Sequence, residues 1–155
     1  MKSMELVPIK QTIEENQQFV DHPDCKETIH MSIGFYKRIG YHPPWIGYYA
    51  KIDYRFVGSC GFKGAPKNGK VEIAYGTFPN HRRKGYAAEM CRQLIRLAWQ
   101  KDPAVIVTAR TLPHENYSTR ILQKNNFQLV GTVRDDEDGD VWEWQYINDS
   151  STRES

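Results

Sequence analysis

A short basic turn leads into the longest amphipathic segment of the chain. Residues 82–85 read Arg-Arg-Lys-Gly, and apolar residues at helical spacing predict a helix over Gly85–Gln100. The first-turn N–H groups of a helix have no partner within the helix, and the helix dipole favours negative charge at that end. Gly85 carries no Cβ that would hold an anion away from these groups. The spacing of Arg82, Gly85 and Ala87 therefore predicts a phosphate-binding turn.

The plain alternative for this turn is a solvated basic surface at the start of a helix. Two further patterns favour ordinary structure over chemistry. Gly58–Gly64 is rich in glycine, but neither a helix nor a Gly-Lys-Ser/Thr triplet follows it, so we expect a strand and a turn there. His22, Cys25 and His30 lack a fourth ligand at zinc-site spacing, so no metal site is expected.

Length and composition exclude several classes of protein. The 155 residues are enough for one domain with its own core, and 12% aromatic residues argue against a disordered chain. Three cysteines at long spacings predict buried thiols in a reducing compartment. No segment has the apolar length of a signal peptide core or of a membrane span, and a net charge of +2 is too small to imply nucleic acid. We therefore expect a cytoplasmic protein with no membrane and no nucleic-acid partner.

Apolar periodicity and turn residues predict the elements that must position the basic turn. We expect one domain over residues 1–149 and a flexible C-terminal tail over 150–155. The expected order is strand, one or two helices, two strands, central strand, long helix, buried strand, short helix and a final hairpin. These elements cover Leu6–Lys10, Asp21–Ile39, Trp45–Lys51, Phe56–Phe62, Val71–Phe78, Gly85–Gln100, Ala104–Arg110, Glu115–Lys124, Phe127–Arg134 and Val141–Ile147.

The predicted central strand runs directly into the basic turn. Its residues alternate between the two faces of the sheet, so Glu72 lies on the face opposite to Tyr75. Ala104–Arg110 is nearly all apolar, as expected for a strand that is covered on both faces. An acidic turn, Asp135–Asp140, joins the last two strands and is expected to be solvated. A role for this turn in recruiting a cationic substrate is the alternative.

A second motif lies downstream of the basic turn. Within Thr111–Phe127 the chain carries Pro, Asn, Ser, an aliphatic pair, Lys and Phe at Pro113, Asn116, Ser118, Ile121, Leu122, Lys124 and Phe127. With the basic turn and the stretch Glu72–Tyr75, this motif resembles the GCN5-related N-acetyltransferase (GNAT) superfamily. Within that superfamily it is most similar to the branch of the ribosomal-protein-alanine and N-terminal acetyltransferases. Gln123 and Asn126 depart from the Glu and Gly of that branch, at positions not expected to touch chemistry.

The resemblance covers about residues 45–135 and implies both a fold and a reaction. The implied fold is α/β (α+β), with a mixed, mostly antiparallel sheet that contains a splayed parallel strand pair and is flanked by helices. The implied reaction is transfer of the acetyl group of acetyl-CoA to a primary amine, directly and without a metal. The implied cofactor contacts are Tyr75, Gly76, Thr77, Arg82, Arg83, Lys84, Gly85, Tyr86, Ala87, Asn116 and Ser118.

The resemblance also suggests catalytic roles. Glu72 is the candidate base for the acceptor amine, and Ser118 the candidate proton donor to the leaving thiolate. Each has a structural alternative, since Glu72 could be a structural carboxylate and Ser118 could favour the start of its helix. The acceptor could be a peptide or protein N-terminus or a small-molecule amine, and the chain a monomer or homodimer. Transfer of another acyl group, or a non-catalytic CoA-binding sensor or interaction module, is the alternative function.

Overall fold

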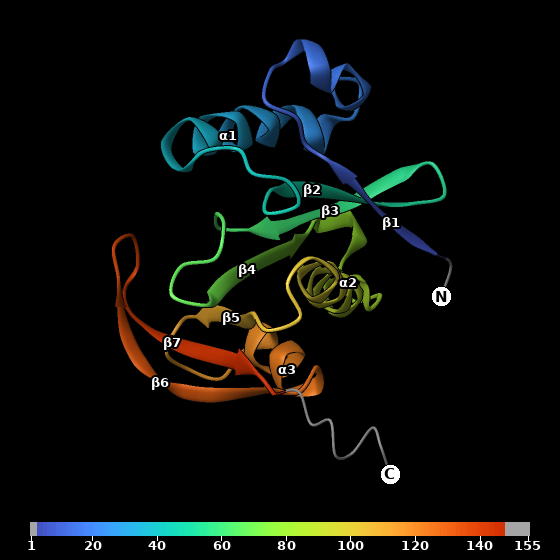
Figure 1. Cartoon of the computed structure of the whole chain (residues 1–155). Coiled ribbons are helices and arrows are strands. Elements are labelled where there is room, and N and C mark those ends of the chain that lie inside the picture. Colours follow the sequence, from blue (N-terminus) through green and yellow to red (C-terminus); the bar gives the residue numbers. More distant parts are fainter. Residues whose placement is uncertain (1–2, 148–155) are drawn as a thin grey trace.

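A computed structural model describes residues 3–147 of the chain. Figure 1 shows a strongly curved sheet with helices on both of its faces. In chain order the elements are β1 (Met4–Pro8), the 3-10 helix η1 (Glu14–Phe19), α1 (Pro23–Ile39), β2 (Gly47–Ile52), β3 (Arg55–Phe62), β4 (Lys70–Thr77), the 3-10 helix η2 (Pro79–His81), α2 (Tyr86–Lys101), β5 (Ile106–Thr111), α3 (Tyr117–Lys124), β6 (Phe127–Asp135) and β7 (Gly139–Tyr146).

The strands form one seven-stranded sheet in the order β1-β2-β3-β4-β5-β7-β6. Within residues 3–147, every pair of neighbouring strands is antiparallel except β4 and β5, which run parallel. A parallel pair needs a crossover connection, and α2 provides it. The predicted mixed, mostly antiparallel sheet with one parallel pair is confirmed.

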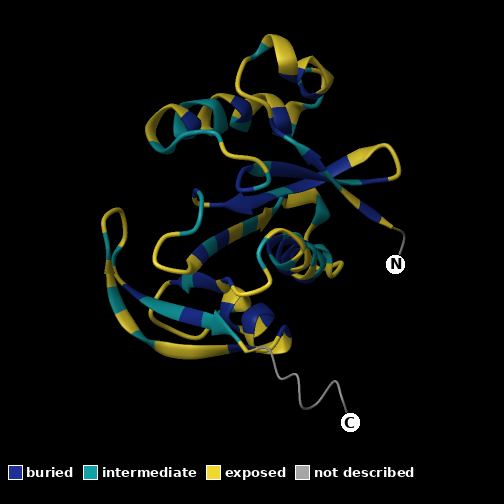
Figure 2. Ribbon diagram, viewed as in Figure 1, coloured by how far each residue is buried: buried dark blue, intermediate teal, exposed yellow. Residues whose placement is uncertain are grey.

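The helices divide between the two faces of the sheet. On one face the Tyr49 hydroxyl donates to the Cys25 carbonyl of α1 over 3.1 Å, and the strand register places Glu72 on this same face. On the other face α2 lies so close that a Cβ on Gly58 would stand 2.9 Å from Cε of Met90. The core concentrates where these layers meet, as Figure 2 shows by the buried residues of β2, β3 and the inner side of α2.

The predicted elements are all present, with bounds within two residues of those expected. The 3-10 helix η1 was not predicted. Its cause is Asn16, which is fully buried, accepts a hydrogen bond from the Lys10 N–H (2.8 Å) and donates to the carbonyls of Lys10 (3.0 Å) and Thr12 (2.9 Å). A turn that depends on one side chain bonding to nearby backbone has no periodic signal in the sequence.

Several other expectations concern the termini, the cysteines and the helices. The predicted tail, 150–155, lies outside the described residues. Cys25, Cys60 and Cys91 are buried free thiols, as predicted. No helix within residues 3–147 has the length and apolarity to cross a membrane.

Candidate active site

The parallel strands β4 and β5 separate before β4 ends. Their pairing stops at Ile73 and Ala109, although β4 continues to Thr77. The end of β4 still pairs with β3, and the end of β5 still pairs with β7. The backbone of residues 74–77 therefore has no strand partner on the β5 side, and its N–H and C=O groups there face a gap.

The turn that follows β4 opens directly into α2. Arg83 and Gly85 have φ angles of 64° and 80°, and Gly85 is the N-cap of α2. Gly85 has no side chain to bond the first-turn N–H groups of α2, so these donors are available to an anion. Arg82 is held beside them because its Nε donates to the Thr77 carbonyl over 3.5 Å. The turn thus combines backbone donors with arginine side chains at the open end of β4.

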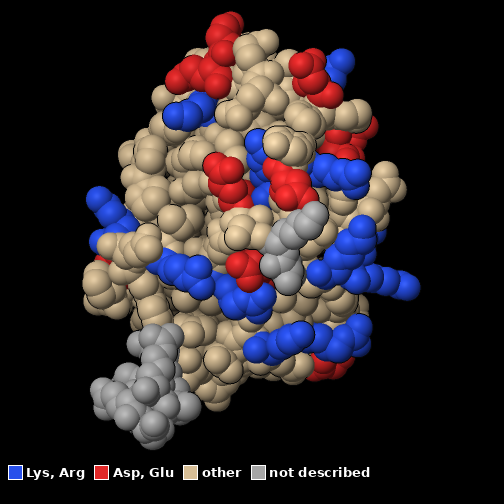
Figure 3. All heavy atoms as spheres, turned by 90° about the vertical axis from the view of Figure 1, so that its right-hand side faces the viewer, with Lys and Arg blue, Asp and Glu red and all other residues tan. Residues whose placement is uncertain are grey.

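A cleft of about 750 Å³ joins these features to the start of α3. Its volume is in the usual range for small-molecule sites. It brings together seven residues that the sequence predicted, namely Tyr75, Gly76, Thr77, Arg82, Arg83, Ala87 and Ser118. Figure 3 shows the molecule from the right-hand side of Figure 1, where α2 and α3 lie. Lys and Arg side chains gather across the lower half of this face. Such a surface favours an anionic ligand.

Three residues that line the cleft were not predicted. They are Tyr117, Arg120 and Ile121 of α3. Positions separated by three and four residues lie on one face of a helix, so the spacing from Tyr117 was the available signal. Arg120 adds a third guanidinium to the cleft, on the side opposite to the turn that precedes α2.

Tyr75 supplies a polar side chain to the cleft in addition to its backbone. Burial raises the pKa of the Tyr75 phenol above its ordinary value, and the neighbouring Cys91 and Tyr117 raise it further. The phenol is therefore protonated at neutral pH. It can donate a hydrogen bond to a ligand in the cleft, but it cannot act as a base there.

Not every residue of the basic turn faces this cleft. Lys84 and Tyr86 line a separate hollow of about 470 Å³, together with His81 and the turn between β2 and β3. The positive φ angles at Arg83 and Gly85 redirect the chain between these side chains. The cleft is therefore lined by Arg82 and Arg83, whereas Lys84 and Tyr86, which were also predicted to contact the cofactor, line the separate hollow.

Two neighbouring hydroxyl groups at the start of α3, those of Ser118 and Thr119, differ in burial and in their hydrogen bonds. Asn116 is the N-cap: its Oδ1 accepts from the Thr119 N–H (3.0 Å), and its own N–H donates to the Thr119 Oγ1 (2.9 Å). Thr119 is fully buried, and its hydroxyl also donates to Glu115 (3.1 Å). Ser118, by contrast, is exposed and lines the cleft. Of the two hydroxyls, only that of Ser118 can reach a ligand in the cleft.

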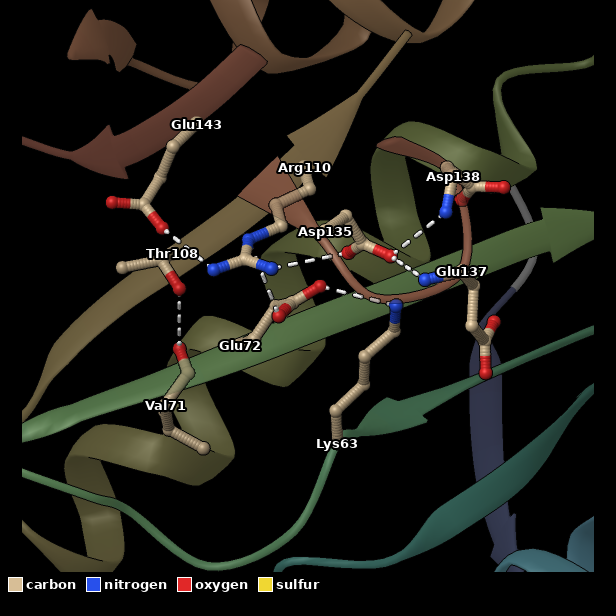
Figure 4. Close-up of polar contacts among 9 residues, drawn as sticks. All are labelled: Lys63, Val71, Glu72, Thr108, Arg110, Asp135, Glu137, Asp138 and Glu143. Carbon is tan, nitrogen blue, oxygen red and sulfur yellow. Dashed lines mark hydrogen bonds and ion pairs between the residues drawn. The ribbon is translucent and has the colours of Figure 1, made fainter. Parts of the chain in front are cut away.

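Glu72 is not in the cleft but on the opposite face of the sheet, as the alternation along β4 predicts. Figure 4 shows its place in a network of charged side chains from five segments. Glu72 Oε2 pairs with Lys63 Nζ at 3.1 Å, and Oε1 lies 3.8 Å from Arg110 Nε. Arg110 in turn pairs with Asp135 (3.1 Å) and Glu143 (3.5 Å). The structure therefore places the two predicted catalytic residues on opposite sides of β4.

A hollow of about 440 Å³ opens beside this network. It lies between α1, the end of the β6–β7 hairpin and the strands that carry the network, and it is lined by Met31, Ser32, Phe35, Arg38, Lys63, Glu72, Arg110, Asp135, Asp136 and Glu137. On the side of α1 its lining combines apolar, polar and basic side chains, and elsewhere it is charged. Because β4 and β5 separate after Ile73, the gap between them lies between this hollow on one face and the cleft on the other.

The network fixes the ionisation of two of its members. Burial lowers the pKa of Arg110, but the hydrogen bond to Asp135 and the charges of Glu72 and Glu143 outweigh it and raise that pKa. The pKa of Asp135 is lowered by the hydrogen bond from the Glu137 N–H and by the Arg110 side chain. Both groups therefore remain charged at neutral pH. No group of His, Cys, Asp and Glu that could hold a metal ion occurs in the described part of the chain.

Comparison with known proteins identifies the family of the chain. Residues 3–128 match the family model of the acetyltransferase (GNAT) domain. The uncharacterized N-acetyltransferase YjdG of Bacillus subtilis (strain 168) is 34% identical over 98 residues, which are 63% of this chain and 55% of that protein. The uncharacterized N-acetyltransferase p20 of Bacillus licheniformis is 33% identical over 80 residues, which are 51% of this chain and 45% of that protein. The chain thus spans about half the length of these curated relatives.

A solved structure shares the fold. The ribosomal L7/L12 alpha-N-protein acetyltransferase RimL, in complex with coenzyme A, superposes with a TM-score of 0.66 at 16% identity and covers 97% of both chains. At this identity the likeness concerns the fold alone. The match of the family model over most of the chain, together with the cleft beside the separated strands, shows that this chain belongs to the GNAT acetyltransferase family.

Proposed function

We propose that the protein transfers the acetyl group of acetyl-CoA to a primary amine in a complex that holds both substrates at once. The observation that supports this most strongly is the cleft in which the open backbone of β4 meets the uncapped first turn of α2. A strand with unpaired backbone groups suits an amide-containing chain, and a helix N-terminus flanked by arginines suits phosphates. Both features of coenzyme A are thus matched within one cleft.

Residues in the walls of the cleft support this proposal. The backbone of Tyr75, Gly76 and Thr77 would bond the amide-containing arm, and Arg82 and Arg83 would neutralise the phosphates. RimL, which has the same fold, was solved with coenzyme A bound. When bound, acetyl-CoA supplies an activated acyl group as a thioester. The protein has then to orient the two reactants and to move protons.

Three side chains are assigned to proton movement. Ser118 lines the cleft and would donate a proton to the departing sulfur, with the Tyr75 phenol as a second donor in the same cleft. Glu72, on the other face, would accept the proton of the amine through the gap between β4 and β5. The acceptor would therefore approach from the hollow beside α1, and acetyl-CoA from the side of α2 and α3.

The chemistry of amines favours a peptide or protein N-terminus as acceptor. A lysine amine, with a pKa of about 10.4, must give up about 4–5 kcal/mol to be neutral at pH 7, whereas an α-amine needs only about 1 kcal/mol. One oxygen of Glu72 is already paired with Lys63 at 3.1 Å, and an α-amine asks the least of such an engaged carboxylate. RimL, by its name, acetylates the α-amine of a ribosomal protein. A small-molecule amine of low pKa would suit the same site.

The test is release of free coenzyme A from acetyl-CoA over a panel of peptides, polyamines and small amines. We expect turnover with at least one α-amine of a peptide or a low-pKa amine, and weaker turnover with lysine side chains. Other acyl thioesters in the same assay test the specificity for acetyl groups. Binding of coenzyme A without turnover on any amine would instead support a non-catalytic CoA-binding module.

A further inference from the structure

Arg110 is placed so that each nitrogen of its guanidinium faces a different carboxylate. Nη1 lies 3.1 Å from Asp135, Nη2 lies 3.5 Å from Glu143, and Nε lies 3.8 Å from Glu72, as Figure 4 shows. The acids come from β6, β7 and β4, while Arg110 itself is on β5. One side chain therefore connects the strands on both sides of the gap.

The position of Arg110 along its strand explains this reach. It follows Ala109, the last residue of β5 that pairs with β4, and it is the direct partner of Glu143 on β7. Glu72 is the partner of Thr108, two residues earlier on the same face of β5. The guanidinium thus lies where backbone pairing between β4 and β5 has just ended. Beyond this point, the ion pairs of Arg110 bridge the gap on this face.

The contact with Glu72 is looser than the other two. Nε of Arg110 is buried and has no hydrogen-bond partner among the described residues, because 3.8 Å is too long for a hydrogen bond to Glu72 Oε1. Oε2 of the same carboxylate is engaged by Lys63. Oε1 therefore faces the guanidinium but forms no hydrogen bond with its Nε.

We propose that Arg110 is a positioning residue that aims the Glu72 carboxylate at the gap between β4 and β5 and anchors it to the β6–β7 hairpin. This rests on the proposed function, in which Glu72 accepts the proton of the amine. Lysine is a poor substitute, since a planar guanidinium has fixed donor directions for three partners and an ammonium is a point charge. Arg110 does not line the cofactor cleft, so its effect is on the acyl-transfer step and not on cofactor binding.

Other charges surround this network and remain in place when Arg110 is changed. A second, smaller hollow of about 290 Å³ adjoins the network at the start of β4 and is lined by Lys67 and Lys70 among others. Besides Glu72 and Arg110, the charged groups that line this hollow and the one beside α1 are Arg38, Lys63, Lys67, Lys70, Asp135, Asp136, Glu137 and Glu143. Replacing Arg110 by a neutral residue leaves Lys63 as the cation paired with Glu72, so the carboxylate is pulled toward one side.

The experiment compares Arg110→Gln and Arg110→Lys with the wild type, using the acceptor found in the amine panel. We expect Arg110→Gln to lower kcat by about tenfold or more and to leave the KM for acetyl-CoA within about twofold, because only the transfer step loses an interaction. Arg110→Lys should recover part of kcat. Arg134→Gln is the matched control, since Arg134 pairs with Asp140 on the same hairpin at 3.7 Å but is largely exposed. Its kcat should stay within about twofold of the wild type.

A second measurement does not depend on turnover. In Arg110→Gln, NMR titration should show the pKa of Asp135 moving up toward its ordinary value, while the affinity for coenzyme A is unchanged. An unmoved Asp135 pKa would overturn the anchoring role. A kcat equal to the wild type, or a parallel loss of kcat and coenzyme A affinity, would overturn the positioning role. If no amine is acetylated at all, the proposed function fails, and the titration still decides whether Arg110 anchors the hairpin.

Discussion

The start of α3 allows the sharpest separation of a structural role from a binding role. The resemblance to the family predicts that Asn116 bonds the cofactor, whereas the structure shows its Oδ1 capping α3. We predict that Asn116→Ala costs about 1 kcal/mol of stability, within the usual range for the loss of a cap. For a chain of this size, that corresponds to a fall in Tm of about 2–4 °C. The cost is not larger because the Asn116 N–H still donates to Thr119 Oγ1.

Two conservative variants divide the roles of the side chain. Asn116→Ser keeps a capping oxygen but removes the amide, and Asn116→Asp keeps the shape but replaces the amide donor with a charge. If the Nδ2 donor binds the cofactor, both variants should keep the wild-type Tm within about 1 °C and should lose affinity for coenzyme A. Thermal unfolding and calorimetry of the same samples measure the two effects.

The refuting results are distinct for each role. A Tm of Asn116→Ala equal to that of the wild type would show that the observed cap does not stabilise the protein. Unchanged coenzyme A affinity in all three folded variants would show that Asn116 serves only the helix. In that case Asn116 would hold Tyr117 and Ser118 in the cleft without touching the cofactor itself.

Three further predictions address the cleft, the proton transfers and the hairpin. Gly85→Asp should weaken coenzyme A binding in calorimetry by at least about tenfold, and neutral Gly85→Asn much less, since both residues tolerate a positive φ and only one repels phosphate; equal losses would point to backbone strain. In a pH–rate profile, Glu72→Gln should lose most turnover near neutral pH and recover partly as the amine deprotonates unaided, whereas Ser118→Ala should lose about ten- to hundredfold at every pH; a wild-type profile for Glu72→Gln would remove it as the base. The lowered pKa of Asp135 means that its ionised form stabilises the fold above its ordinary pKa and that this contribution is lost as the pH falls through the folded value. Urea unfolding should therefore find Asp135→Asn less stable than the wild type at pH 7, with a deficit that shrinks as the pH falls below the ordinary pKa of Asp; a deficit that does not change with pH would refute the linkage.

Hydrophobic periodicity predicted most of the fold, because the helices and strands of this chain bury regularly spaced apolar side chains. The alternation along β4 placed Glu72 and Tyr75 on opposite faces, as the structure shows. What periodicity cannot reveal is how side chains from distant segments meet. The charged network joins Lys63, Glu72 and Arg110 to the hairpin across the curve of the sheet, and no spacing in the sequence signals it.

The candidate site was predictable to a similar extent. Residues on a strand end and a helix start could be assigned, because their backbone groups must be open wherever such elements meet. The directions of individual side chains in the basic turn could not, because they depend on positive φ angles at Arg83 and Gly85. The separation of Lys84 from the cleft is a consequence of that local geometry.

The early separation of β4 from β5 makes the sheet a partition with an opening in it. In the proposed function, the acyl donor and its recipient bind on different faces of the sheet, and the residues that both contact are the few at the opening. Substitutions on the α1 face could then change the recipient without affecting binding of the acyl donor. A chain built in this way can acquire new recipients by small changes in one wall while the chemistry at the opening stays the same.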